Sequence, residues 1–246
     1  MTLYADDTQA RLDLTAALRS ASRMHLGEGI CNHFSLALPG KPGQFLINPQ
    51  GLHWSEITPA DLVVVDAQGN KVSGKHAVEP TAFFIHGAIH RGNANATCVM
   101  HTHMPNATAL TVIRNGRLEW ASQTALKFYN RVAYDDHYNG LALDDAEGAR
   151  MCGKMGDADV LFLGNHGVIV SGASVSATFD DLYYLERACA LQVLAMSCGK
   201  PLHLVSEAIA EKTARQMAHE SQQAALHLEA LKRVLDRDEP GWSRLD

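Results

Sequence analysis

The sequence predicts an α/β fold with three α/β/α layers, in which helices cover both faces of a mostly antiparallel central sheet. Two observations predict it. Apolar runs of strand length alternate with longer segments of helical periodicity. Pro-Gly, Asn-Pro and Gln-Gly-Asn turn signals separate neighbouring runs closely enough for hairpins. Because no repeat, low-complexity tract or charge block divides the 246 residues, we expect a single domain over residues 1–246, with a helical tail from about 204.

The first third of the chain predicts a helix, a group of short strands and a second helix. The opening helix runs from about Asp7 to His25, with Leu14 and Leu18 on one face, and glycines follow its end. Three apolar runs then have the length of strands: Phe34–Leu38, Phe45–Ile47 and Leu62–Val65. Pro80 suits the first turn of a helix that we expect to reach about Arg91.

The rest of the chain predicts further strands and a helical end. Thr97–His101 has the length of a strand, and Pro105 can begin the next helix. A buried strand is expected at Val160–Leu163, and Val168–Val170 stays apolar after the turn that follows. A long helix over Ser174–Ser197 and a more polar one over Ser206–Asp236 complete the prediction; they are separated by Gly199-Lys200-Pro201.

Composition excludes several classes of partner. The net charge of −6 and the pI near 6.1 leave no basic excess for nucleic acid. The start, Met1–Asp7, lacks the pattern of a signal peptide, and no apolar run has the roughly 18 residues of a membrane span. The five cysteines are odd in number and form no Cys-x-x-Cys pair. We therefore expect reduced thiols and a cytoplasmic protein that acts on small molecules.

Three short segments could carry chemistry. Side chains two apart on a strand share a face, so His101 and His103 can reach one ion, although such pairs are often structural. His166 stands between Asn165 and Gly167 after a buried strand, where a plain turn is the alternative. Glu79 begins the second helix, and there the alternative is a carboxylate that complements the helix dipole.

Together these segments resemble the class II aldolase/adducin family. The shared order is Asn48-Pro49-x-Gly51, Glu79, His101-x-His103 and Asn165-His166-Gly167, and the resemblance extends from about Leu12 to Lys200. It implies that His101, His103 and His166 bind a divalent metal ion, with Zn²⁺ expected and Mn²⁺ or Co²⁺ as alternatives. It also implies that Glu79 is the acid/base, or a fourth ligand in the resting enzyme.

The resemblance further implies a homotetramer with each site at a subunit boundary. A tyrosine often protonates the leaving group in the family, and Tyr134 and Tyr138 are the two candidates here. Packed aromatic side chains are the alternative for both.

The chain departs from the family where its aldolases hold a phosphate. In the Gly-Thr-x-Gly-Asn-x-Ser loop, Ile30 stands at the threonine and His33 at the asparagine, and Ala77-Val78 replaces a Ser-Ser pair. Three hydrogen-bonding groups to a phosphate dianion are therefore missing, each worth roughly 1.5–3 kcal/mol. The remaining candidates for substrate binding are His33, Ser35, Asn48, Gly51, Ser73, Lys75 and His76. For Lys75 and His76 an ordinary loop role is the alternative.

We therefore expect a metal-dependent carbon–carbon lyase, either a decarboxylase or an aldolase. Its substrate would be a small, non-phosphorylated hydroxy or keto acid, or an aromatic hydroxy acid. Loss of carbon dioxide and loss of an aldehyde both leave an enolate that a metal ion can stabilise, so the sequence does not choose between them. The alternatives are a sugar-phosphate aldolase or epimerase, and an adducin-like interaction module without activity. The retained Glu79 and histidine set favours the enzyme.

Overall fold

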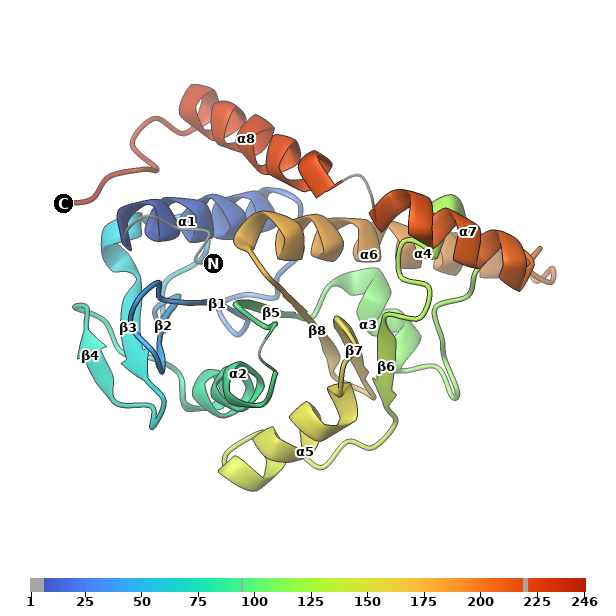
Figure 1. Cartoon of the computed structure of the whole chain (residues 1–246), viewed down its shortest axis with the longest axis horizontal. Helices are drawn as coiled ribbons and strands as arrows, with labels where there is room; N and C mark the ends of the chain where they lie inside the picture. The colour runs from blue at the N-terminus through green and yellow to red at the C-terminus, as the bar shows by residue number, and fades with distance from the viewer. Residues whose placement is uncertain (1–6, 94, 219–220) are drawn as a thin grey trace.

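The computed structural model describes residues 7–93, 95–218 and 221–246, and its centre is one eight-stranded sheet (Figure 1). The strand order is β4-β3-β2-β1-β5-β8-β7-β6. Every neighbouring pair is antiparallel except β6 with β7. The strands are β1 His33–Ala37, β2 Gln44–Ile47, β3 Val63–Asp66, β4 Lys71–Ser73, β5 Cys98–Thr102, β6 Val132–Asp135, β7 Val160–Leu163 and β8 Gly167–Gly172.

Helices cover both faces of this sheet, which confirms the predicted three-layer α/β/α fold. The helices are α1 Asp7–Arg23, α2 Pro80–Gly92, α3 Pro105–Thr111, α4 Gln123–Leu126, α5 Asp145–Met155, α6 Val175–Met196, α7 Glu207–Ala218 and α8 Ser221–Asp238, with a short 3₁₀ turn at Pro59–Asp61. In Figure 1, α1, α6 and α8 lie over one face, and α2 and α5 lie under the other.

Strand alternation divides polar from apolar side chains in the middle of the sheet. Phe34 of β1 and Met100 of β5 are fully buried in the core under α1 and α6. Their neighbours along the strands point to the opposite face. His33, Ser35 and His101 therefore lie on the face that α2 covers, with His33 directly opposite His101 in the β1–β5 pair. The fold thus brings three polar side chains together in the interior.

The middle of the chain contains elements that the sequence did not reveal. Helices α4 and α5 and strands β4 and β6 were not predicted. Each is short or strongly polar, so its apolar periodicity is weak: β4 is exposed throughout, and α5 buries only Gly148, Met151 and Met155.

The helix expected over Ser206–Asp236 is wrong as one element, because the structure has two helices there, with residues 219–220 outside the described ranges. Different packing accounts for the division. Helix α7 lies against α4, whereas α8 packs on α1 and α6. Leu228, Leu235 and Trp242 join the same buried cluster as the first helix. Helix α8 and the residues after it are therefore part of the main core.

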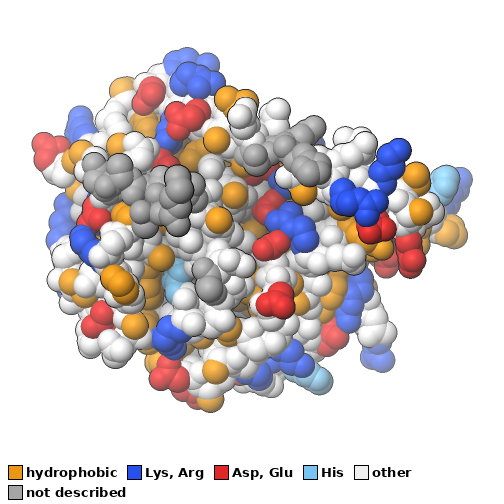
Figure 2. Space-filling model, in the orientation of Figure 1, with side chains coloured by type: hydrophobic (Ala, Val, Ile, Leu, Met, Phe, Trp, Pro, Cys, Tyr) orange, Lys and Arg blue, Asp and Glu red, His pale blue; other side chains and the backbone are white. Residues whose placement is uncertain are grey.

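Among the described residues no helix combines the length and the apolar character that crossing a membrane requires. On the face drawn in Figure 2, acidic and basic side chains are intermingled, without a broad area of one sign. The first six residues, on which the signal-peptide expectation mainly rests, lie outside the described ranges.

Candidate active site

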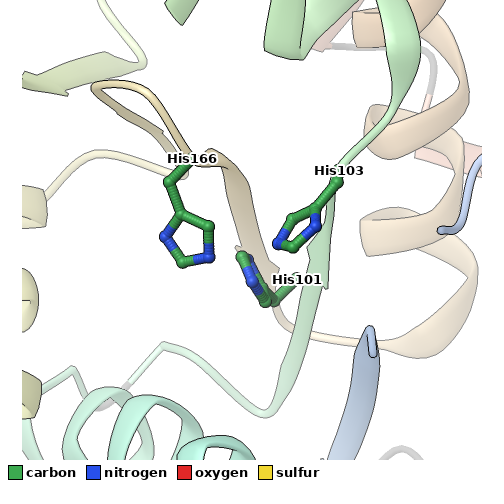
Figure 3. A group of neighbouring side chains, drawn as sticks. All are labelled: His101, His103 and His166. Carbon is green, nitrogen blue, oxygen red and sulfur yellow. The ribbon is translucent and has the colours of Figure 1, made fainter. Parts of the chain in front are cut away.

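Three histidines converge at one end of the middle of the sheet (Figure 3). His101 is the fourth residue of β5, His103 follows the end of that strand, and His166 lies in the turn between β7 and β8. One potential ligand atom from each lies within 4.8 Å of the other two. The ring centroids are 4.8–5.1 Å apart. The structure thus joins two segments that are far apart in the sequence.

Hydrogen bonds fix which nitrogen of two of these rings is available. Nδ1 of His101 lies 2.9 Å from the carbonyl oxygen of Val168, so Nδ1 carries the hydrogen and Nε2 keeps its lone pair. Nδ1 of His103 lies 2.6 Å from the carboxylate of Glu28, with the same result. Nε2 of His103 is buried and has no hydrogen-bond partner among the described residues. An imidazole with one bare nitrogen, whose other nitrogen is hydrogen-bonded to a carboxylate, is suited to bind a metal ion. The three histidines therefore fit a divalent ion.

Burial keeps the rings of His101 and His166 neutral at neutral pH. Burial, together with the neighbouring His166 and His103, lowers the pKa of His101 well below its usual value. Burial and the adjacent His103 lower the pKa of His166 to about 4. Metal ions bind the unprotonated imidazole, so this environment favours the form of the two rings that can bind a metal ion.

The Asn-His-Gly turn positions His166 through its backbone. Asn165 has a φ of +57°, a left-handed conformation that asparagine tolerates, and its N–H donates to the carbonyl of Thr111. A Cβ at Gly167 would lie 2.5 Å from the carbonyl oxygen of Thr102 and 2.8 Å from the ring of His103. Only glycine therefore lets the turn approach the end of β5 closely enough for the three rings to meet.

Glu79 is the N-cap residue of α2, and its carboxylate points toward β1. It lies 2.9 Å from Nε2 of His33 and accepts a 2.5 Å hydrogen bond from the Thr81 hydroxyl. The hydrogen bond from His33 is the largest influence on it and lowers its pKa, although partial burial opposes the shift. Glu79 is therefore a carboxylate at rest, in the form that accepts a proton. Because His33 lies opposite His101, this places Glu79 on the triad's side of β1.

The other predicted substrate-binding residues divide into two groups. Asn48 stays close to the His33 loop: it accepts from the N–H of Phe34 and donates to the carbonyl of Asn32. Gly51 has a φ of +86° with open space where a Cβ would be. Ser35 lies beneath His33, completely buried between two histidine rings.

The structure does not bring Ser73, Lys75 and His76 to the triad. Ser73 is exposed on β4, which lies four strand spacings, roughly 19 Å, from β5. Lys75 and His76 instead face Asp61, at 3.4 and 3.0 Å. Lys75 and His76 therefore make a local contact with Asp61. Nothing in the sequence indicated that Asp61 is their partner.

The two tyrosines also separate. Tyr134 packs on the α6 side of the sheet, stacked on Phe162, and its hydroxyl accepts from the N–H of Leu118. Burial raises its pKa to about 12. Tyr138 is half exposed, and its ring lies 6.3 Å from that of His166. Of the pair, only Tyr138 lies beside the triad of its own chain.

Sequence reasoning missed Glu28 and Asn32. Asn32 is buried, and its Oδ1 accepts from the N–H groups of Glu28 and His103, which ties the loop before β1 to the end of β5. Glu28 comes directly before Gly29, the first residue of the loop that was compared with the phosphate-binding loop of the family. Nothing in the spacing of Glu28 indicated that it contacts His103.

Comparisons with known proteins find relatives that match most of this chain. A crystal structure of an aldolase II superfamily protein from Pseudomonas syringae matches with a TM-score of 0.90 and 34% identity, over 99% of this chain and 98% of the other. Decarboxylase NovR from Streptomyces niveus is 30% identical, with 82% of this chain and 74% of NovR covered. Alpha-adducin from Rattus norvegicus is 34% identical over 79% of this chain, which spans 27% of that protein. The profile of the Class II Aldolase and Adducin N-terminal domain matches residues 12–193, so this chain belongs to the class II aldolase and adducin family.

Proposed function

We propose that the protein is a divalent-metal-dependent carbon–carbon lyase. The observation that carries the proposal is the convergence of His101, His103 and His166, with Glu79 held in its basic form by His33, the cross-strand partner of His101. The substrate is a small, non-phosphorylated hydroxy or keto acid, or an aromatic hydroxy acid. Membership in a family that includes aldolases, together with the similarity to a decarboxylase, supports a lyase.

The three histidines would hold the ion, which supplies a Lewis acid that stabilises negative charge on a substrate oxygen. The Val168 carbonyl and the Glu28 carboxylate orient two of the rings before any ligand arrives. The Glu79 carboxylate accepts or returns a proton at the substrate. His33 holds this carboxylate by its Nε2–H, and Thr81 holds the same oxygen, so its direction is set by two donors.

The loop before β1 supports a substrate without phosphate. Ile30 is 44% exposed and offers an apolar surface where the family's phosphate-binding loop has a hydroxyl. His33 is already engaged with Glu79, so it is not a free donor for a dianion. An apolar side chain in a loop that contacts His103 through Glu28 and Asn32 suits a carboxylate carried on an aromatic or aliphatic body. Decarboxylation and aldol cleavage both meet this description.

The assembly that we propose is a homotetramer in which a second copy completes each site. Two cavities of about 530 and 570 Å³ lie elsewhere, one lined by Arg117 and Gln192, the other by Lys127 and Asp180; neither is lined by the triad. Ile30 and Tyr138 are exposed and provide apolar surface that a neighbouring subunit can cover.

The five cysteines are all unpaired, which supports the proposed cytoplasmic location.

Metal analysis followed by a substrate screen tests the proposal. The purified protein is expected to hold about one divalent ion per chain and to release carbon dioxide or an aldehyde from keto acids or aromatic hydroxy acids. Chelation should abolish turnover, and adding back Zn²⁺, Mn²⁺ or Co²⁺ should restore it. A protein that binds no ion and converts none of these acids or the corresponding sugar phosphates would instead be an adducin-like interaction module.

A further inference from the structure

The contact between β1 and α2 is a line of polar side chains. On β1, Nε2 of His33 lies 2.9 Å from Glu79. Two residues on, the Ser35 hydroxyl lies 2.7 Å from Nδ1 of His86 and 2.7 Å from Nε2 of His90. Ser35 and His86 are completely buried. We call these five residues the polar seam; it fixes the register of the helix that carries Glu79 against the strand that carries His33.

The direction of every hydrogen bond at one end of the polar seam follows from a single carbonyl. Nδ1 of His90 lies 2.8 Å from the oxygen of Ala96, which can only accept, so Nδ1 carries the hydrogen. Burial lowers the pKa of His90 to about 4, so the ring is neutral and its Nε2 is an acceptor. The Ser35 hydroxyl therefore donates to His90. Having one hydrogen, it must accept from Nδ1 of His86.

This leaves two bare nitrogens at the other end. Burial lowers the pKa of His86 well below its usual value, so with its hydrogen on Nδ1 its Nε2 holds a lone pair. A neutral His33 that donates through Nε2 to Glu79 has an acceptor at Nδ1 as well. Both nitrogens are buried without a partner among the described residues. The two rings are perpendicular, with centroids 6.1 Å apart. An unpaired buried acceptor costs about 1–3 kcal/mol, so one donor shared by the two is favoured.

We infer that a single buried water donates one hydrogen to Nδ1 of His33 and the other to Nε2 of His86. A water has two hydrogens, one for each of the two bare nitrogens. It keeps the His33 proton on Nε2, facing Glu79, and ties that ring to α2. Ser35 and His90 are then positioning residues, because they set the tautomer that makes His86 an acceptor. The inference concerns the resting protein and holds whether or not the chain is a lyase.

Ring tautomers test this directly. In nitrogen NMR spectra of the histidine-labelled, metal-loaded protein at neutral pH, His86 and His90 are expected as Nδ1–H tautomers and His33 as the Nε2–H tautomer. Signals are assigned by their loss in single-residue variants. A crystal structure at high resolution should place a water within hydrogen-bond distance of both bare nitrogens. His86 as an Nε2–H tautomer, His33 as an imidazolium, or an empty gap would each overturn the inference.

Ser35→Ala separates the polar seam from general packing. Without the hydroxyl, Nδ1 of His86 has no acceptor, and we expect this ring to change to the Nε2–H tautomer and donate to the water instead. Metal content should stay at the wild-type level. Ser73→Ala, at an exposed serine on β4, is the matched control and should leave all three rings unchanged. An unchanged His86 tautomer in folded Ser35→Ala contradicts the inference; if that variant does not fold, the wild-type spectrum and the water decide.

Discussion

The carboxylate of Glu28 lies 2.6 Å from Nδ1 of His103, on the side of the ring opposite its bare, buried Nε2. A carboxylate in this position orients a ligating imidazole and increases its basicity. The side chain of Glu28 is 70% exposed, so solvent weakens the contact, and its value lies in orientation more than in stability. Figure 3 shows the His103 ring turned toward the other two histidines, as this contact requires.

Removing Glu28 should therefore weaken metal binding while leaving the fold intact. For Glu28→Ala we expect metal affinity to fall by roughly 10-fold, at the low end of the 10–100-fold typical of such supporting carboxylates. A competition titration against a chromophoric chelator measures it. Glu207→Ala, in the first turn of α7, is the control and should bind metal like the wild type. Equal affinities in the two variants would remove Glu28 from the site.

Replacing His101 and His103 together by alanine should empty the metal site. Two of three ligands are lost, and the single ring of His166 cannot retain the ion at micromolar protein. Elemental analysis after gel filtration gives the result. His203→Ala, at an exposed histidine outside the triad, should keep full metal content. A double variant that still carries about one ion per chain would place the metal elsewhere.

Glu79→Gln should slow turnover without emptying the site. The amide keeps the shape of the side chain but cannot take up a proton, and general acid–base steps contribute roughly 10²–10⁴-fold, so kcat should fall by about that factor. Metal content should not change. If Glu79 only complements the dipole of α2, the same change would cost at most about 1 kcal/mol of stability and leave kcat intact. A rate measurement beside a melting curve separates the two roles.

Non-phosphorylated acids should outperform sugar phosphates as substrates. Ile30, Ala77 and Val78 provide no side-chain donors where the related aldolases have hydroxyl groups, and His33 is occupied by Glu79. The measurement is kcat/KM for a panel of keto and aromatic hydroxy acids beside fuculose 1-phosphate and ribulose 5-phosphate. A higher kcat/KM for either phosphate would refute our interpretation of this loop.

Asp61 should make stability depend on pH in acid. Partial burial acts against ionisation, but hydrogen bonds from Thr58 and His76 and the charge of Lys75 prevail and lower the pKa of Asp61 to about 2. A carboxyl whose pKa is lower in the folded state stabilises the protein above its unfolded pKa, and this contribution disappears as pH falls from about 4 to 2. Asp61→Asn should lose about 2 kcal/mol of unfolding free energy at pH 6 and less at pH 3. Urea unfolding at both values checks it, and an equal loss at both would contradict the mechanism.

The sequence predicted the layers of the fold because these rest on local patterns, whereas the expected ligand set came from the resemblance to the family. His101 lies on β5 and His103 comes directly after its last residue, so the alternation of an extended chain indicates that both side chains share one face. Pro80 and Ser174 mark the starts of α2 and α6, as their residue types indicate. The stretch from β6 through α5 was missed because it is short or polar and is defined by tertiary contacts.

The residues that support the site could not be predicted, because their partners are distant. Glu28 meets a histidine 75 positions away, and Ser35 meets His86 across 51. The same reason explains Tyr134 and Lys75, whose polar groups are used by Leu118 and Asp61 and not by the triad. The residue type indicates which hydrogen bonds or ion pairs a side chain can form, but the partner depends on the tertiary structure.

The histidine triad depends on the pairing of β5 with β8, two strands that are far apart in the sequence. His101 is bonded to Val168, 67 positions along the chain, so the triad exists only after a long loop has closed. Such long-range pairings form slowly, and an ion that needs the finished triad cannot guide the early steps. An ion that binds only the folded chain still stabilises it by mass action. If its contacts are absent from the transition state for folding, that stabilisation would appear as slower unfolding: a bound ion would extend the lifetime of the native state without speeding folding.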